Sequence, residues 1–269
     1  MPDIMNAIYN MRRLDDLARK QTSVHRLHPL AKLITTVAFL AVVVSFGKHE
    51  IGGLLAFFFY PVILFVLAEL PAAPILKRVL LIEPLIIGVG ILSPLFESRT
   101  FILGGLVLSA GWITFLSIFI KCGLTVVAAL LLIATTGMDR LAEALRMLRV
   151  PKIFVLQLLL TYRYISVLSE EAARMLRAYA LRSPQQKGVH RSAWGSFAGQ
   201  LLLRTFDRAQ RVYQAMRLRG FAGEYNTGEA AKIKAADLIY LSAWGGFFAA
   251  ARIYNIPVLI GSLFTGVMR

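Results

Sequence analysis

EEAARMLRAYALRS (Glu170–Ser183) and DRAQRVYQAMRLRG (Asp207–Gly220) are two copies of one fourteen-residue pattern, which is the most informative feature of the chain. Aligned without a gap, the copies begin on an acid and share alanine, arginine and leucine at five further positions. Each copy ends on Leu-Arg followed by a small residue, Ser183 or Gly220. The apolar residues recur at helical spacing, so we predict two amphipathic helices. An arginine at each C-terminal end suits the helix dipole.

The composition around the repeat is that of a membrane protein. Of the 269 residues, 57% are hydrophobic and 17% are charged, and the mean hydropathy is +0.65. An average soluble domain is about 45–50% apolar and about 25% charged. Several apolar runs approach the roughly 20 residues that cross a bilayer as a helix. We therefore predict an all-α, polytopic helical membrane protein with about five to six transmembrane helices.

The charge is strongly basic, at +15 from 30 Lys and Arg against 15 Asp and Glu. In a soluble protein this excess would favour nucleic-acid binding. In a membrane protein, basic residues gather in cytoplasmic loops and bind anionic headgroups, so we expect the lipid bilayer and no nucleic acid as partner. Basic residues before the first span predict a cytoplasmic N-terminus. The first thirty residues contain no apolar stretch typical of a signal peptide.

Hydropathy divides the chain into three predicted regions. Residues 1–137 hold an N-terminal cytoplasmic segment and transmembrane helices, and residues 237–269 form a C-terminal transmembrane region. Between them, residues 138–236 form a cytoplasmic domain with two long helices, which carry the repeat. The predicted spans are Leu30–Phe46, Ile51–Leu70, Leu80–Phe96, Gly111–Thr136, Asp237–Tyr254 and Ile256–Met268, and the predicted cytoplasmic helices are Met138–Arg149, Pro151–Arg182 and Ser192–Arg219.

Three charged positions admit more than one interpretation. Lys121 lies inside an apolar run, and we expect it to face the bundle interior in a structural or a functional role. Arg163 lies between two tyrosines. It is either a core site that pairs with Glu69 or Glu83 or binds carbonyls, or part of an interfacial aromatic belt, which we favour. The acidic pair Glu170–Glu171 either contacts basic residues of the second long helix or is solvated.

The stretch from LRVPKIFVLQLLLTYRYISVL to the second copy of the repeat resembles the transmembrane coupling (T) component of energy-coupling factor transporters, in their cobalt/nickel branch. The resemblance implies two long coupling helices that cross on the cytoplasmic side. It implies three partners: an ABC-type ATPase dimer, a substrate-binding integral membrane subunit and the bilayer. The implied location is the cell (inner) membrane. ATP is bound by the partner ATPase, so this chain needs no cofactor.

The resemblance also assigns candidate site residues. A small-Arg-small motif at the end of each coupling helix docks on one ATPase subunit in that family. Here leucine replaces the usual alanine at the first position of both motifs. HRLHPLAK (His25–Lys32) resembles the family's Asp-Pro-Arg box only in part, because His28 and Leu30 replace Asp and Arg. The predicted ATPase-docking residues are Leu181, Arg182, Ser183, Leu218, Arg219 and Gly220, and the predicted membrane-partner contacts are Leu176, Ala180, Val212 and Met216.

We expect no enzyme. The chain has no GxxxxGK[ST] phosphate loop, no GxSxG and no HExxH. His25 and His28 have no nearby ligands to complete a metal shell, and the single Cys122 forms no internal disulfide. The alternatives are a stand-alone secondary transporter or channel, a T component that serves a vitamin, and a membrane enzyme. A secondary transporter would show inverted repeats and a polar midplane site, and the sequence shows neither.

Overall fold

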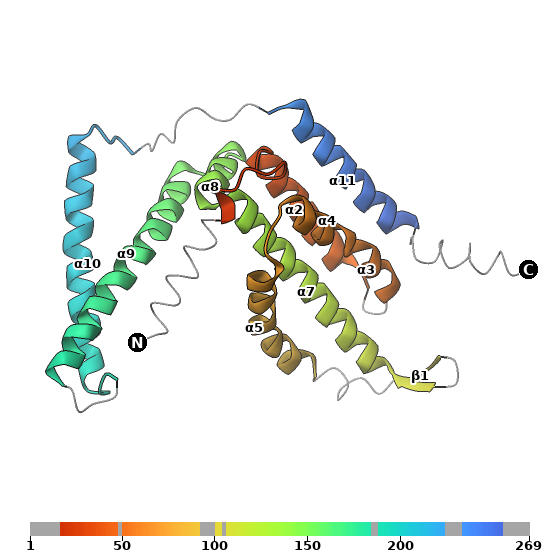
Figure 1. Cartoon of the computed structure of the whole chain (residues 1–269), viewed down its shortest axis with the longest axis horizontal. Helices are drawn as coiled ribbons and strands as arrows, with labels where there is room; N and C mark the ends of the chain where they lie inside the picture. The colour runs from red at the N-terminus through yellow and green to blue at the C-terminus, as the bar shows by residue number, and fades with distance from the viewer. Residues whose placement is uncertain are drawn as a thin grey trace, which may run out of the picture. The chain divides into compact units, whose positions relative to one another are not determined.

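The computed structural model describes residues 17–47, 50–91, 100–103, 106–183, 188–223 and 233–254, and most of these are helical (Figure 1). They form two compact units: residues 17–137 with 233–254, and residues 138–223. The predicted fold class, an all-helical membrane protein, is confirmed. One short antiparallel hairpin interrupts it, in which Thr100 of β1 (Thr100–Leu103) is opposite Ser109 of β2 (Leu106–Ser109).

Three helices of the first unit agree with predicted spans to within two residues. They are α2 (Pro29–Ser45), α7 (Ala110–Thr136) and α11 (Ala235–Tyr254). Among the described residues, two helices are both long and apolar enough to cross a membrane: α7, with a mean hydropathy of 2.4, and α9 (Lys152–Arg182), with 1.3. The predicted number of spans stays a prediction, and Ile256–Met268 lies outside the described residues.

The second predicted span is interrupted near the proline within it, Pro61, where a kink is expected, and the third predicted span differs from the structure in its start. The second is two helices, α3 (Ile51–Phe57) and α4 (Phe59–Leu67), because Pro61 has no N–H to donate to the carbonyl of Phe57. The third is wrong in its start, since α5 (Ala72–Gly90) begins eight residues before Leu80. Its Pro74 lies in the first turn, where proline is tolerated, and Pro84 lies inside the helix.

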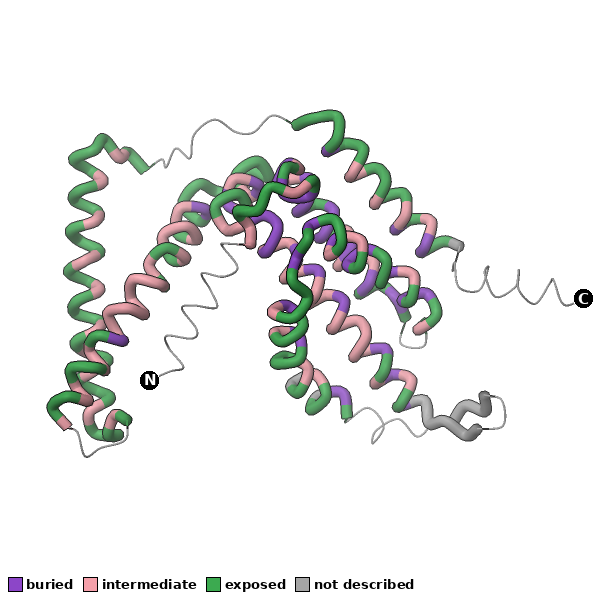
Figure 2. The backbone as a smooth tube through the Cα atoms, in the orientation of Figure 1, coloured by how far each residue is buried: buried purple, intermediate pink, exposed green. Residues whose placement is uncertain are grey.

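The core of the first unit is aromatic. Phe39 and Phe57 are completely buried, and Tyr60 is 1% exposed. The rings of Phe39 and Tyr60 stack with centroids 4.7 Å apart, and those of Phe57 and Phe248 stack at 5.9 Å. These contacts join α2, α3, α4 and α11. Buried residues are concentrated in this unit (Figure 2).

Lysines of the first unit bind carbonyls at the C-terminal ends of helices. Lys32, only 2% exposed, donates from Nζ to the carbonyl of Thr135 in the last turn of α7, at 2.8 Å. Lys20 donates to the carbonyl of Glu69, just after α4, at 2.8 Å. The last carbonyls of a helix have no partner within the helix and carry the negative end of its dipole, so these cations stabilise them.

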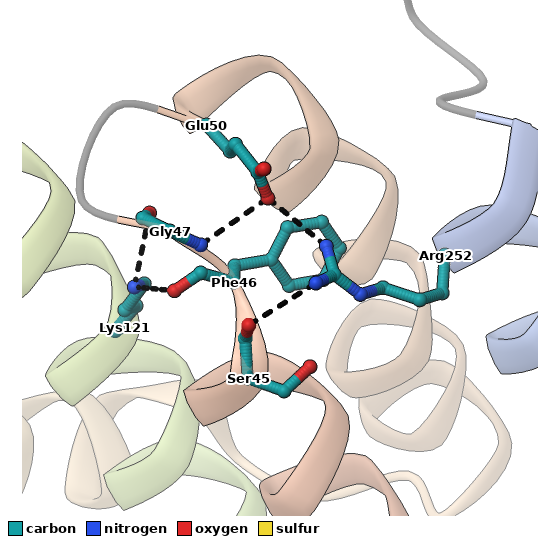
Figure 3. Close-up of polar contacts among 6 residues, drawn as sticks. All are labelled: Ser45, Phe46, Gly47, Glu50, Lys121 and Arg252. Atoms are coloured by element: carbon teal, nitrogen blue, oxygen red, sulfur yellow. Dashed lines mark hydrogen bonds and ion pairs between the residues drawn. The ribbon is translucent and has the colours of Figure 1, made fainter.

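Lys121 also binds carbonyls at the C-terminal end of a helix. Its Nζ donates to the carbonyls of Phe46 and Gly47, at 2.6 and 3.3 Å, after the end of α2 (Figure 3). From α11, Arg252 donates to the carbonyl of Ser45 at 3.1 Å and to Glu50 at 2.9 Å, and its guanidinium lies 4.3 Å from the ring centroid of Phe46. Lys121 therefore joins α7 to the end of α2, which is a structural role.

The ion pair of Glu50 with Arg252 predicts that the stability of the chain depends on pH. The Arg252 guanidinium and the Gly47 N–H hold the pKa of Glu50 below its ordinary range. A carboxylate with a lowered pKa stabilises the fold above its unfolded pKa and loses that contribution as the pH falls through its folded pKa. We expect Glu50→Gln to lower the Tm slightly at neutral pH, because the pair is half exposed. The difference from wild type should shrink as the pH falls below the ordinary glutamate pKa of about 4.3, and it should vanish once the pH is below the lowered pKa of the folded state.

The measurement is thermal unfolding of both proteins in detergent across this pH range. A Tm difference that stays constant into acid would contradict the assignment of the effect to the Glu50 carboxylate.

His28 and Asp237 hold the N-terminal end of α2. His28 is the N-cap, and its Nδ1 accepts the N–H of Leu30 at 3.1 Å, as an aspartate would do. The N–H of His28 donates to Asp237 Oδ1 at 2.7 Å. Asp237 Oδ2 accepts the N–H of Lys234 at 2.7 Å, so one carboxylate, 4% exposed, binds the N-terminal ends of α2 and α11.

Candidate docking helices

The second unit consists of α8 (Met138–Met147), α9 and α10 (Ala193–Leu218). Pro151 precedes α9 with φ −53° and ψ 134°, the extended conformation that starts a helix. The first half of α9 is apolar, and the second half holds the first copy of the repeat. The predicted limits of α9 and α10 are confirmed to within one residue. Arg163 is exposed on α9.

An ion pair between the two copies' helices marks their contact. Glu171 of α9 accepts from Arg204 of α10 at 2.6 Å, and also from Arg174 one turn away. The carboxylate side chain is 16% exposed. Near the connection, the N–H of His190 donates to the Tyr179 hydroxyl at 3.4 Å. Of the two interpretations of Glu170–Glu171, contact with the second helix is therefore the one that the structure shows for Glu171.

The two motif arginines lie at opposite ends of this helix pair. The helices run antiparallel, so Arg182 ends α9 beside the connection, whereas Arg219 follows α10 at its far end (Figure 1). The 26 residues of α10 span roughly 39 Å at 1.5 Å per residue. The structure therefore separates the two motifs by about one long helix.

The two helix ends differ in how the backbone closes. After α10, the N–H of Phe221 donates to the carbonyl of Met216 and that of Gly220 to Arg217, the two bonds of a Schellman motif. Gly220 has φ +83°, a conformation that favours glycine. After α9, the N–H of Ser183 donates to Tyr179, and Ser183 has φ −133°. The glycine stop predicted for the second helix is confirmed.

Both motifs present their side chains to solvent. Leu181 is 83% exposed and Leu218 is 89% exposed, and Arg182 and Arg219 are exposed beside them. Ser183 is half-buried, and Gly220 is exposed. Each helix therefore ends in an exposed leucine followed by an exposed arginine. That pair offers a partner an apolar contact and a guanidinium for carboxylates or carbonyls.

The predicted membrane-partner contacts are less exposed than other apolar residues of α10. Leu176, Ala180, Val212 and Met216 are all half-buried. Every residue of α10 is described and none is buried, which Figure 2 shows as an absence of purple. Its exposed apolar stripe is Leu202, Phe206 and Tyr213, exposed by 69%, 62% and 56%.

Sequence reasoning missed this stripe, although its spacing was available. Residues at i, i+4 and i+11 share one helix face, so Leu202, Phe206 and Tyr213 are aligned along α10. We call these three residues the α10 stripe. The repeat placed emphasis on positions that the two copies share, and Leu202 and Phe206 precede the second copy.

Alanine at two glycines of this unit is expected to change the free energy of unfolding in opposite directions. Gly220→Ala is expected to destabilise the chain by about 1–2 kcal/mol, because alanine is strained at positive φ. Gly199→Ala, inside α10 with open space around its Cα, is expected to stabilise it by about 0.5–1 kcal/mol. Thermal unfolding in detergent measures both, and equal shifts of one sign would contradict the assigned conformations.

The described residues hold no group of three or more His, Cys, Asp or Glu side chains placed as metal ligands. His25, 1% exposed, contacts the Thr22 hydroxyl through Nδ1 at 2.7 Å and the carbonyl of Leu17 through Nε2 at 3.1 Å. Burial lowers the pKa of His25. Both ring nitrogens therefore take part in packing the start of the first unit.

Comparison with protein families identifies the context of these helices. The sequence model of the cobalt transport protein family, CbiQ, matches residues 20–229, which is most of the chain. This chain belongs to the CbiQ family. Both helix-end motifs lie within the matched residues. CbiQ proteins are membrane components of energy-coupling factor transporters, which work with ATPases and a substrate-binding subunit, so the predicted family is confirmed.

A relative of this CbiQ-family chain is an uncharacterized protein of Methanocaldococcus jannaschii. The two sequences are 28% identical over 222 residues, which cover 78% of this chain and 75% of the relative.

Proposed function

We propose that this chain is the coupling subunit of an energy-coupling factor importer. In this role it transmits ATP-driven movement of an ATPase dimer to a substrate-binding membrane subunit. The observation that carries the proposal is the pair of exposed Leu-Arg ends, at Arg182 and Arg219, on opposite ends of one antiparallel helix pair. Two like sites at a distance suit two like ATPase subunits, each of which takes one helix end.

The mechanism follows from the geometry of the pair. When the ATPase subunits approach each other, they draw the ends that hold Arg182 and Arg219 together. Because α9 and α10 contact through Glu171 and Arg204 between those ends, the helices change their angle about this contact. A membrane subunit bound on α9 and α10 then moves with them. Its contacts are Leu176, Ala180, Val212 and Met216, extended by the α10 stripe.

The chain's own residues bind and move, and we assign them no catalysis. ATP is bound and hydrolysed by the partner. The membership of the CbiQ family supports cobalt as the cargo, with nickel as its close chemical alternative and a vitamin as the third candidate. We place the chain in the cell (inner) membrane with a cytoplasmic N-terminus, and residues 138–236 on the cytoplasmic side.

A stand-alone secondary transporter or channel is the other candidate. Lys121 was the intramembrane charge that favoured it, since a charge in a span marks an ion pathway. In the structure this ammonium binds two carbonyls at the end of α2. That contact gives the Lys121 charge a structural role, so the charge no longer favours an ion pathway.

The test is purification of the tagged chain in detergent from its native membrane, with mass spectrometry of the proteins that accompany it. The complex is then placed in liposomes, and uptake of radioactive Co²⁺ is measured with ATP or with a non-hydrolysable analogue. We expect an ATP-binding subunit in the complex and uptake only with ATP. Uptake by the chain alone, without an ATPase, would show that it is a secondary transporter.

A further inference from the structure

The corner between α8 and α9 is an exposed surface that the coupling role does not use. It runs from Arg146 to Phe154, and all of its residues except Val150 are exposed. Its large apolar side chains face solvent: Leu148 is 48% exposed, Ile153 is 69% and Phe154 is 65%. The same nine residues hold three cations and no acid. We call this segment, Arg146–Phe154, the α8–α9 corner.

The backbone of the corner is ordered by a turn that favours glycine. Arg149 has φ +61°, and α8 closes with a Schellman motif, in which the N–H of Val150 donates to Leu145 and that of Arg149 to Arg146. An L-residue other than asparagine or aspartate is uncommon at positive φ, and Glu69 after α4 is the other described residue of this kind. The corner therefore holds an arginine where glycine would be the relaxed choice.

The cations of the corner come together from both helices. Arg146 of α8 and Lys152 of α9 line one small recess with Glu143, and its volume is about 20 Å³, the size of a water molecule. The recess is too small for a substrate. Its importance is that it shows two cations of the corner on a common surface, with Arg149 in the turn between them.

A short covalent connection joins the corner to α7, a helix long and apolar enough to cross a membrane. Gly137 is the one residue between α7 and α8. The 27 residues of α7 span roughly 40 Å at 1.5 Å per residue, more than the ~30 Å hydrocarbon core. The ten residues of α8 add only about 15 Å. The chain therefore connects the corner to the end of the apolar helix α7 through one short helix, α8.

We propose that the α8–α9 corner lies in the membrane interface and binds anionic phospholipids. Leu148, Ile153 and Phe154 insert at the boundary of the acyl chains, and Arg146, Arg149 and Lys152 bind headgroup phosphates. Exposed aliphatic and aromatic side chains interleaved with cations are typical of segments that lie in the interface. The positive charge is complementary to the anionic lipids of the cytoplasmic leaflet. This anchor fixes the start of α9 while its far end moves.

The corner's depth can be measured with nitroxide labels, because the chain has one cysteine. In a Cys122→Ala background, a label at Phe154→Cys is compared with a control at Leu218→Cys, a side chain that is also strongly exposed. Each protein is placed in nanodiscs of phosphatidylcholine, with or without phosphatidylglycerol. Collision of the label with O₂, which dissolves in lipid, is compared with collision with a water-soluble nickel chelate.

We expect the Phe154 label to collide more with O₂ and several-fold less with the nickel chelate than the Leu218 label. Phosphatidylglycerol should strengthen this difference. Arg149→Gly combined with Lys152→Gln should remove the effect of phosphatidylglycerol, and glycine at 149 relieves the backbone, so a failure to fold is avoided. Phe154 and Leu218 labels with equal access to the chelate would overturn the anchor. A Phe154 label that inserts equally with and without phosphatidylglycerol would overturn the assignment of the cations to headgroup phosphates.

Discussion

Reversing the charge at both helix ends, with Arg182→Glu and Arg219→Glu in one chain, is expected to abolish co-purification of the ATPase. Both guanidinium groups are exposed at the ends of α9 and α10, so the substitutions change the surface without removing packed atoms. If each arginine forms a desolvated charge pair in the complex, its loss costs about 2–5 kcal/mol. Two such losses weaken binding roughly a thousandfold or more.

The matched control reverses two other arginines of the same helices. Arg177→Glu with Arg211→Glu changes the net charge equally, at exposed positions of α9 and α10 away from the motifs. We expect this control to retain the ATPase. Each single motif variant should lose part of the binding, because one attached end keeps the other near its site. Equal loss in control and motif variants would show that net charge, and not docking at the helix ends, determines the association.

The long helices were predictable because their signals are local. Pro151 starts α9, Gly220 stops α10, and the apolar spacing between them needs no knowledge of distant residues. The repeat then placed Arg182 and Arg219 at two equivalent ends. The repeat does not predict that α9 and α10 run antiparallel. The contact of Glu171 with Arg204 joins residues 33 positions apart, and only the folded pair shows that the two motifs lie at opposite ends.

The surface of α10 shows where a repeat misleads. Positions shared by two copies reflect what the copies have in common, which here is the helix end. The α10 stripe begins before the second copy, so comparison of the copies gave no weight to Leu202 or Phe206. Helical periodicity alone would have aligned them with Tyr213. Val212 and Met216 were chosen from the repeat, and they lie half-buried.

The basic charge was interpreted through loops and headgroups, and the structure adds a second use for it. Lys20, Lys32 and Lys121 donate to carbonyls at the ends of other helices, over separations of 49, 103 and 75 residues. A helix that ends inside a membrane protein must have its last carbonyls satisfied. Such partners cannot be predicted from a single sequence, because any cation on a neighbouring helix at the right height would serve.

A second large effect, on stability, is expected at Asp237, which binds the N-terminal ends of α2 and α11. Asp237→Ala should destabilise the chain by about 2–5 kcal/mol, because two backbone N–H groups, those of His28 and Lys234, lose their acceptor. The contact with His28 is buried. Each N–H belongs to the start of a helix, so the carboxylate also opposes the positive ends of two helix dipoles.

A graded series separates these contributions. Asp237→Asn keeps one acceptor oxygen but turns an amide NH₂ towards the other N–H. Its unfolding temperature should therefore lie between those of wild type and Asp237→Ala. Asp207→Ala, an exposed acid on α10, should change the free energy of unfolding by no more than about 0.5 kcal/mol. Thermal unfolding in detergent orders the variants, and hydrogen exchange locates the loss. If the Asp237 carboxylate stabilises both helices, Asp237→Ala increases hydrogen exchange at the starts of α2 and α11 together. Increased exchange in α11 alone would show that Asp237 only caps its own helix and that α2 is held by the aromatic core.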